Sequence, residues 1–420
     1  MHILQVCPRV PYPPHDGGAI GIYEIIRGVS AAGHRVTVLA LNTPKHHQPA
    51  TALAHLGPNV HLVTVDVDTT LKPLRALRNL LLGPPDMPYN VERFVSPAFA
   101  ARLAELLRTN DFDAVHLDGT FVAWCADGPA GAAAAGHPPL VLRAHNVEYI
   151  IWERLAEREG NPLKKWYLNH LAQRMKRFEQ AMLHRVDAVA AITADDAARL
   201  QALGCPAPIA IIPAPANTAR FRPDAARAPQ PRTVFMLGSL NWLPNLEGVD
   251  WFLGEVWPAA HREMPYLELH IAGSHPPAYL AQRPAGQDGV FVHGFVESAP
   301  DFMQTYELML VPLLSGGGMR VKIVEGMALG KAILSTAIGA EGIEAEDGTE
   351  MLLRDGAAAW LQTLRDYYHG RLPLAAIGAA AARTAQAKYS TEAVAAGFEA
   401  LYRAQQLARQ PSLAATPVGG

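Results

Sequence analysis

Short apolar runs alternate along the first half of the chain with longer segments whose apolar residues recur every three or four positions. The short runs predict buried strands and the longer ones predict helices, because these are the repeats of the two structures. The helical segment GIYEIIRGVSAAG ends at Gly33, a residue placed to close a helix. The predicted strands are HILQVC, HRVTVLAL, VHLVTVDV, DAVHLD, PLVLRAH and DAVAAIT. This alternation predicts an α/β domain with a parallel sheet between two layers of helices.

A second series of strands follows a segment that has no periodicity. That segment, at 214–231, is rich in proline and alanine and is typical of a linker. The strands predicted after it are TVFMLGSL, LELHIAG, VFVHGFV, LMLVPLL and AILST. We therefore expect a first α/β domain at 1–213 and a second at 232–388.

One more helix is predicted near the end of the chain, at 389–410. Ser390 or Thr391 can cap its first turn. Its apolar positions have helical spacing: Val394, Phe398, Leu401 and Tyr402. The residues after it, 411–420, are expected to form a disordered tail.

Composition excludes several classes of protein. The 420 residues carry 50% hydrophobic side chains and a net charge of −3, which argues against a general nucleic-acid binder. Cys7, Cys125 and Cys205 are too scattered for a disulfide framework or a zinc site, which favours a reducing compartment. The chain lacks a signal-peptide pattern and an apolar run of about 18–20 residues. These features predict a cytoplasmic protein.

The long loop after the first strand does not have the dinucleotide-binding pattern of glycines, and the second strand ends at Leu41-Asn42 without an acid. NAD binding is therefore not expected. Gly17 and Gly18 have two readings. They either form an ordinary loop before a helix or let a ligand approach a helix N-terminus closely.

The segment with the most chemistry runs from Ser315 to Gly330. Gly316, Gly317 and Gly318 let the backbone approach a ligand, and the next helix offers N–H groups to a phosphate. Arg320 and Lys322 can add charge-assisted bonds to the same anion, and Glu325 follows one turn later, where it can accept bonds from ribose hydroxyls. The alternative is a loop followed by a surface Lys322–Glu325 ion pair.

These features resemble the donor-site signature of retaining GT-B glycosyltransferases, family 4 or group 1 type, which include polysaccharide transferases. The resemblance covers most of the chain and extends through DGGA, RAHNVEY, FMLGSLNWLPN, HGFV and KYSTEAVAAGFEALY. It implies two Rossmann-like domains facing a central cleft, with the final helix crossing back onto the first domain. It also implies a hexosyltransferase-like enzyme that takes a nucleoside-diphosphate sugar as donor and needs no separate cofactor.

The resemblance implies roles for several residues on the donor side. Glu325 matches the second of two family glutamates and would hold the ribose, whereas the first falls on Gly317. A basic pair that many members carry after the first strand of the second domain is missing here, so Asn241 or Asn245 can offer only neutral hydrogen bonds. Arg320 and Lys322 would then neutralise the diphosphate. The remaining expected donor contacts are Gly18, Gly294 and Val296.

On the acceptor side, the end of the strand PLVLRAH places His145, Asn146 and Glu148 where open α/β sheets bind ligands. His145 is either a satisfied structural histidine or a site residue, and the family often has a histidine at this strand end. Asp118 in VHLDG is either a turn or capping residue or a second acceptor contact. We expect His145, Arg320 and Lys322 to be the catalytic residues.

No metal is expected in the reaction. The pair Asp66 and Asp68 has the Asp-x-Asp pattern of metal-dependent transferases, but it is far from the glycine loop and is more typical of solvated acids at a strand end.

Two basic stretches, at 71–82 and 163–185, mix cations with large apolar residues. They predict either reversible docking on the inner face of a membrane that carries a lipid-linked acceptor, or amphipathic helices packed on their own domain. Two other functions stay open at this stage. A sugar-nucleotide epimerase would act without an acceptor, and a non-catalytic sugar-nucleotide binder would show no turnover.

Overall fold

The computed structural model describes residues 1–14, 16–128, 137–224, 226–316 and 318–409. The predicted tail at 411–420 and the glycine at 317 lie outside these residues. The chain forms two compact units: Met1–Ile212 together with the chain from Val394 onward, and Pro213–Ala393. Each unit contains one parallel sheet.

The sheet of the first unit has seven strands in the order β3-β2-β1-β4-β5-β6-β7. Every pairing between neighbours is parallel, for example Ile3 with Val36 and with Ala114. The strands are β1 (His2–Cys7), β2 (Arg35–Asn42), β3 (Val60–Asp66), β4 (Ala114–Asp118), β5 (Leu140–Ala144), β6 (Ala188–Ala191) and β7 (Ile209–Ile211).

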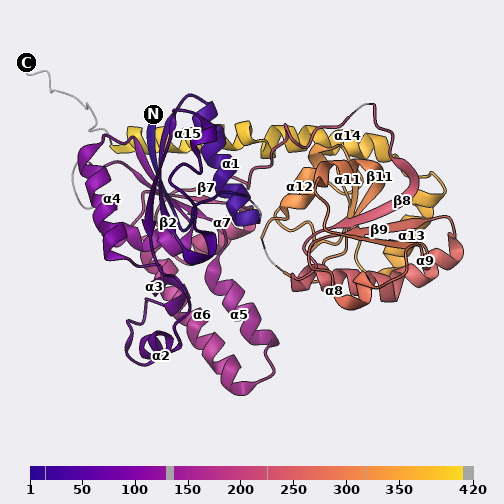
Figure 1. The fold of residues 1–420 in the computed structure, drawn as a ribbon, viewed down its shortest axis with the longest axis horizontal. Helices are drawn as coiled ribbons and strands as arrows, with labels where there is room; N and C mark the ends of the chain where they lie inside the picture. The colour runs from indigo at the N-terminus through magenta and orange to yellow at the C-terminus, as the bar shows by residue number, and fades with distance from the viewer. Residues whose placement is uncertain (15, 129–136, 225, 317, 410–420) are drawn as a thin grey trace, which may run out of the picture. The chain divides into compact units, whose positions relative to one another are not determined.

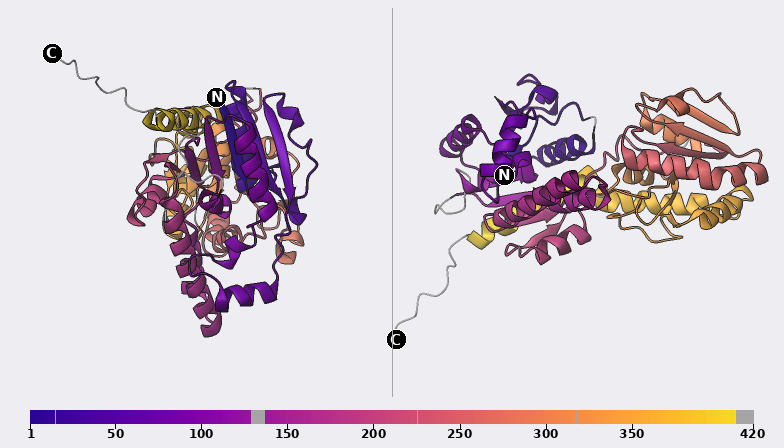
Figure 2. Two further views of the ribbon diagram at one scale, coloured as in Figure 1. Left: turned by 90° about the vertical axis from the view of Figure 1, so that its left-hand side faces the viewer. Right: turned by 90° about the horizontal axis from the view of Figure 1, so that it is seen from below.

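Helices cover both faces of this sheet (Figure 1). The helices of this unit before its last one are α1 (Gly17–Ala31), α2 (Pro73–Leu82), α3 (Tyr89–Glu92), α4 (Pro97–Thr109), α5 (Glu148–Arg158), α6 (Pro162–Leu183) and α7 (Ala194–Ala202). A 3₁₀ helix follows β4 at Thr120–Asp127. Helices α5 and α6 form an antiparallel hairpin that extends away from the sheet (Figure 2).

The last helix, α15 (Thr391–Arg409), packs on the first unit. The Ser390 hydroxyl accepts a bond from the Ala393 amide at 3.1 Å and so caps the first turn, as predicted. All four predicted apolar positions are buried, and Phe398 and Tyr402 belong to the core cluster that covers β1, β2 and β4.

The sheet of the second unit has six strands in the order β10-β9-β8-β11-β12-β13, again all parallel. They are β8 (Gln230–Leu237), β9 (Glu268–Ala272), β10 (Val290–Gly294), β11 (Tyr306–Val311), β12 (Ala332–Ser335) and β13 (Leu352–Leu353). The helices around it are α8 (Leu243–Trp251), α9 (Trp257–Glu263), α10 (Ala278–Ala281), α11 (Ala299–Thr305), α12 (Val321–Ala328), α13 (Ala357–Tyr368) and α14 (Leu374–Thr384).

The predicted α/β class and the two Rossmann-like sheets are confirmed. Two short strands, β7 and β13, escaped prediction because runs of two or three residues are too short to show a period. Helix α1 begins at Gly17, earlier than its apolar pattern suggests. The reason is that the Asp16 carboxylate accepts a bond from the Ala19 amide at 3.0 Å and caps the helix there.

Candidate active site

The strand order of each sheet reverses at one point, the topological switch point. It lies between β1 and β4 in the first unit and between β8 and β11 in the second. Loops leave such a point in opposite directions and open a crevice at the carboxyl ends of the strands, which is where open α/β sheets bind ligands. In this chain both reversal points are lined by polar residues that the sequence singled out.

The loop at 315–318, which precedes α12 and is called the glycine loop below, needs glycine for conformational and steric reasons. Gly316 and Gly318 have φ angles of +110° and +79°, which side chains disfavour. A Cβ at Gly316 would lie 2.8 Å from the Arg320 guanidinium and 3.4 Å from the Trp242 ring. The loop backbone therefore lies against Arg320 and Trp242. Nothing in the sequence indicated that Trp242 would contact this loop.

Arg320 stands immediately before α12 and is buried. Its Nη1 donates to the Gly318 carbonyl at 2.8 Å, and its guanidinium carbon lies 5.3 Å from the centre of the Trp242 ring. Through these contacts Arg320 holds the glycine loop in place. Its assignment to the donor diphosphate stays a prediction.

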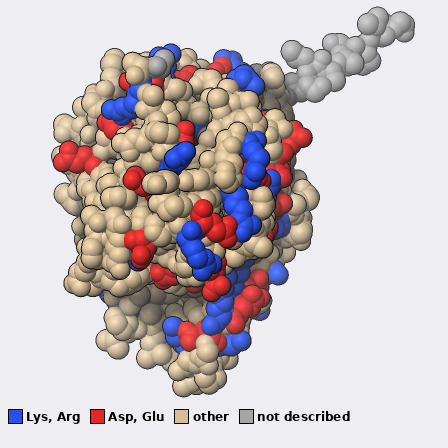
Figure 3. Space-filling model, turned by 90° about the vertical axis from the view of Figure 1, so that its right-hand side faces the viewer, with Lys and Arg blue, Asp and Glu red and all other residues tan. Residues whose placement is uncertain are grey.

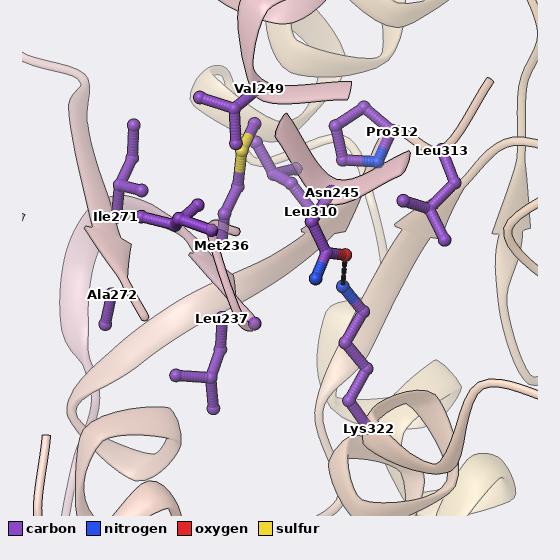
Figure 4. A pocket seen from close by; sticks show the side chains of 12 residues that line it. Met236, Leu237, Asn245, Val249, Ile271, Ala272, Leu310, Pro312, Leu313 and Lys322 are labelled. Carbon is purple, nitrogen blue, oxygen red and sulfur yellow. Dashed lines mark hydrogen bonds between the residues drawn. The ribbon is translucent and has the colours of Figure 1, made fainter. Parts of the chain in front are cut away.

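Lys322, on the first turn of α12, faces the reversal point between β8 and β11 (Figure 4). Its Nζ donates to Asn245 Oδ1 at 2.8 Å and borders a small cavity of about 20 Å³. A Cβ at Gly238 would lie 2.7 Å from Asn245 Nδ2 and 3.1 Å from Lys322 Nζ, so a side chain there would displace this pair. Burial, and then the nearby Arg320, lower the pKa of Lys322 to about 7. This places a titratable cation at the switch point of the sheet.

Other predicted donor residues lie at the same edge of the second unit with different surroundings. Asn241 is exposed and accepts a bond from the Ser239 hydroxyl at 2.8 Å, so Asn245 takes the place beside Lys322. Gly294 ends β10 with a φ of +66°, and its carbonyl accepts from the Gly273 amide at 2.7 Å. Val296 is partly buried against the core, and Glu325 is partly exposed on α12.

A carboxylate that the sequence did not point to also reaches the glycine loop. Glu247 of α8 accepts a bond from the buried Ser315 hydroxyl at 2.5 Å. The contact ties the start of the loop to α8. The two residues are 68 positions apart, and the sequence around Glu247, NLEGVDW, gives no indication of the contact.

In the first unit, one cavity of about 550 Å³ brings together all four predicted acceptor residues, Asp118, His145, Asn146 and Glu148. Gly18, predicted as a donor contact, lines the same cavity, so the structure groups it with the acceptor residues. The cavity lies where β1, β4 and β5 end, at the reversal point of the sheet.

Asp118 and His145 form a close pair in this cavity. The Asp118 carboxylate is fully buried, and its Oδ1 lies 2.5 Å from His145 Nε2, while Oδ2 accepts from Gln5 Nε2 at 2.5 Å. Burial alone would raise the pKa of Asp118, but the interaction with His145 outweighs it and lowers the pKa to about 2. Asp118 is therefore ionised at neutral pH. It binds His145 and is not a mere turn residue.

Glu148 begins α5 beside a second acid that the sequence did not flag, Glu179. The Glu179 carboxylate accepts from the amides of Glu148 and Tyr149 at 2.9 and 3.0 Å and so caps α5. Burial raises the pKa of Glu179 to about 8 and also raises that of Glu148. Asn146 Nδ2 donates to Glu148 at 3.4 Å. These shifts favour the neutral form of both acids, and of the two Glu148 lines the cavity.

Three cations also line the cavity: Arg9, Lys45 and Arg93. Arg9 forms an ion pair with Asp16, the cap of α1, and its Nη1 lies 3.2 Å from His46 Nε2. Sequence reasoning missed these residues, because single basic residues in three separate loops show no pattern before the fold gathers them.

Among the residues that the structure describes, no group of three or more acidic, histidine or cysteine side chains could hold a metal ion. The Asp-x-Asp pair is engaged locally, since Asp66 accepts from Asn42 at 2.9 Å and Asp68 pairs with Lys72 at 2.6 Å. No described helix is both long enough and apolar enough to cross a bilayer.

Two family models match the chain. Residues 15–220 match "Glycosyltransferase Family 4" and residues 231–369 match "Glycosyl transferases group 1". A relative from the cps region of Klebsiella pneumoniae, an uncharacterized 44.6 kDa protein, is 22% identical over 374 residues. That match covers 87% of this chain and 90% of the relative.

Solved structures share the fold over nearly the whole chain. Sucrose-phosphate synthase from Thermosynechococcus elongatus superposes with a TM-score of 0.68 at 16% identity, covering 97% of this chain and 100% of the synthase. Anabaena HepE in complex with UDP-glucose gives a TM-score of 0.61 at 14% identity, covering 96% of this chain and 100% of HepE.

Two Rossmann-like units in one chain form the GT-B fold, which these solved structures share. With both halves matched by family models, the chain belongs to glycosyltransferase family 4, of the group 1 type, and is a transferase.

Proposed function

We propose that this enzyme transfers a sugar from a nucleoside diphosphate to a glycan or lipid-linked acceptor, with retention of configuration and without a metal. The observation that carries the proposal is Lys322, which Asn245 holds at 2.8 Å at the switch point of the second unit, beside the glycine loop. A cation in that place suits a diphosphate. Anabaena HepE, which shares the fold, has been solved with UDP and with UDP-glucose, and this supports a nucleotide-sugar donor.

The donor is held from both ends in this proposal. Lys322 and the N–H groups at the start of α12 bind the diphosphate, while Arg320 braces the loop and adds positive charge. Glu325, one turn later, accepts bonds from the ribose hydroxyls. Gly294 and Val296 contact the base at the end of β10.

The reaction breaks the bond between the anomeric carbon and the diphosphate oxygen and forms a bond from that carbon to an acceptor oxygen. Negative charge builds on the departing diphosphate, so preorganised cations stabilise the transition state more than the bound donor. In the retaining reaction the departing phosphate takes the acceptor's proton. The cations and the helix N-terminus replace a divalent ion in this scheme.

The cavity of the first unit orients the acceptor. Because Asp118 is ionised and bonds to His145 Nε2, it favours the proton on that nitrogen. The other ring nitrogen, Nδ1, can then accept a hydrogen bond from the acceptor hydroxyl. Asn146 and Glu148 add polar contacts on the same wall of the cavity.

We place the enzyme in the cytoplasm, at the inner face of the membrane, and in polysaccharide biosynthesis. All three cysteines are free and buried, which suits a reducing compartment. The Klebsiella relative belongs to a cps region, which supports the polysaccharide role.

Calorimetric titration with UDP-, GDP- and ADP-linked sugars, followed by transfer assays, tests the proposal. At least one donor should bind. Lys322→Ala should slow transfer by raising the activation barrier by about 2–4 kcal/mol. Glu325→Gln should mainly weaken donor binding, because the charge on the ribose does not change during the reaction. Lys388→Ala, an exposed lysine that pairs with Glu344, is the control.

Binding without transfer to any acceptor would instead identify a sugar-nucleotide binder. Normal transfer by Lys322→Ala would remove that lysine from the site.

A further inference from the structure

Helix α2 exposes large apolar side chains that a helix packed on its own domain would bury. The exposed fractions are 84% for Leu74, 51% for Leu77 and 69% for Leu81, and Leu71 and Leu82 on either side of them are exposed too. Of the residues in α2, only Asn79 is buried. The helix is nevertheless held in place, because Arg174 of α6 donates to the Asn79 carbonyl at 2.8 Å.

The exposed leucines lie together. Leu74, Leu77 and Leu81 have the i, i+3, i+7 spacing of one helical face. The charged residues of the segment 71–82 are all cations, Lys72, Arg75 and Arg78. On the face of the molecule drawn in Figure 3, by contrast, basic and acidic residues are intermixed. Lys72 pairs with Asp68 at 2.6 Å, whereas Arg75 and Arg78 are exposed beside the apolar stripe. An apolar stripe beside exposed cations matches a surface of hydrocarbon and negative headgroups.

The start of α6 has the same character. Leu163 is 79% exposed and Trp166 is 60% exposed, and Lys164 and Lys165 between them are exposed as well. Helix α2 and the α5–α6 hairpin extend from the same side of the first unit in Figure 1 and in the left view of Figure 2. The later part of α6 differs, since Met175, Phe178 and Met182 are buried in the core. Only its first turns are therefore available to a partner.

This surface borders the acceptor cavity. Thr69, Thr70 and Leu71, which lead into α2, line the same cavity as Asp118 and His145. An acceptor whose lipid tail stays in a bilayer could therefore present its head group to the cavity without leaving the membrane.

We propose that Leu74, Leu77 and Leu81 of α2, with Leu163 and Trp166 of α6, dock the protein on an anionic phospholipid bilayer. Arg75, Arg78 and Lys165 bind the headgroups, while Lys72 and Lys164 are paired with Asp68 and Glu159. Exposed leucines enter the interface, and the cations add electrostatic attraction that salt weakens. The link to a lipid-linked acceptor rests on the proposed function, but the membrane contact itself does not.

Co-sedimentation with vesicles tests the contact. The full-length protein should bind vesicles of phosphatidylglycerol and phosphatidylcholine, bind less at high salt, and bind weakly to phosphatidylcholine alone. The triple variant Leu74→Ser, Leu77→Ser, Leu81→Ser should lose about tenfold or more in vesicle affinity. The control Leu407→Ser changes a leucine that is equally exposed, at 66%, but lies on α15. It should bind as the unchanged protein does.

Two further measurements separate the outcomes. Donor titration measures binding to the second unit. The triple variant should therefore bind donor normally although its affinity for vesicles is reduced. Analytical ultracentrifugation tests whether the leucines instead join two copies of the chain, in which case the triple variant would change the oligomeric state. Such a change, or unaltered vesicle binding by the triple variant, would overturn the proposal.

Discussion

Lys322 is the residue whose charge depends most directly on its surroundings in the candidate donor site. Its pKa is lowered to about 7 because burial and the neighbouring Arg320 disfavour the ammonium form. A bound diphosphate favours that form. Donor affinity should therefore be highest below pH 7 and should fall by about tenfold per pH unit above it, until the pKa of the complex is reached.

Calorimetry of the donor complex across that pH range measures this effect. Lys322→Arg should flatten the profile, because arginine stays protonated. Lys331→Arg is the matched control, since Lys331 also has a lowered pKa, about 8, but donates to the Tyr306 carbonyl at the start of β11. A flat profile in the unchanged protein would mean that Lys322 does not meet the diphosphate.

Tyr402 connects the last helix to the buried polar residues beneath the acceptor cavity. Its hydroxyl lies 2.6 Å from His116 Nδ1, and His116 Nε2 lies 3.9 Å from Asp118. Burial lowers the pKa of His116 to about 4, so this ring is neutral at pH 7. Tyr402→Phe should cost about 1–3 kcal/mol of unfolding free energy, because it leaves a buried nitrogen unpaired.

Urea denaturation measures that cost, with the exposed Tyr266→Phe as a control that should change little. Donor affinity, which belongs to the second unit, should stay unchanged in both variants. Equal stability of Tyr402→Phe and the control would argue against the hydrogen bond.

At the scale of elements, α15 should matter most to the unit that it covers. Phe398 is fully buried, and its ring lies 4.9 Å from the His116 ring and 5.3 Å from the Arg143 guanidinium. Phe398→Ala should destabilise the first unit by about 3–5 kcal/mol through the lost burial and the cavity left behind. Leu407→Ala, on the exposed side of the same helix, should have little effect.

Hydrogen exchange can locate this loss. Amides of β1 and β4 should exchange faster in Phe398→Ala, whereas those of β8 and β11 should keep their protection. Equal acceleration in both units would show that α15 stabilises the chain as a whole.

At the scale of the whole molecule, the reaction should proceed without a divalent ion. The described residues contain no acidic cluster for one, and Lys322 with the N-terminus of α12 can stabilise the leaving diphosphate instead. Transfer should therefore continue in EDTA at a rate near that of the untreated enzyme. Complete loss of transfer, restored by magnesium or manganese, would show that the cations are insufficient.

The sequence by itself determined what depends on local order. The periods of apolar residues predicted most strands and helices, because a buried face repeats every two or every 3.6 residues. Caps such as Ser390 and turns such as Gly33 could be read from a few neighbouring residues. Gly316 and Gly318 before α12 were visible for the same reason, and their φ angles are ones that most other residues disfavour.

Only the tertiary structure decided which polar groups meet. Asp118 and His145 pair because β4 and β5 are neighbours in the sheet, and Lys322 meets Asn245, 77 positions away, because β8 and β11 flank the switch point. Strand order likewise placed Gly18 among the acceptor residues and brought Arg9 and Glu148 to the same cavity. The physical reason is that apolar periodicity specifies which face of an element is buried, whereas the contacts of a site depend on how distant elements are ordered.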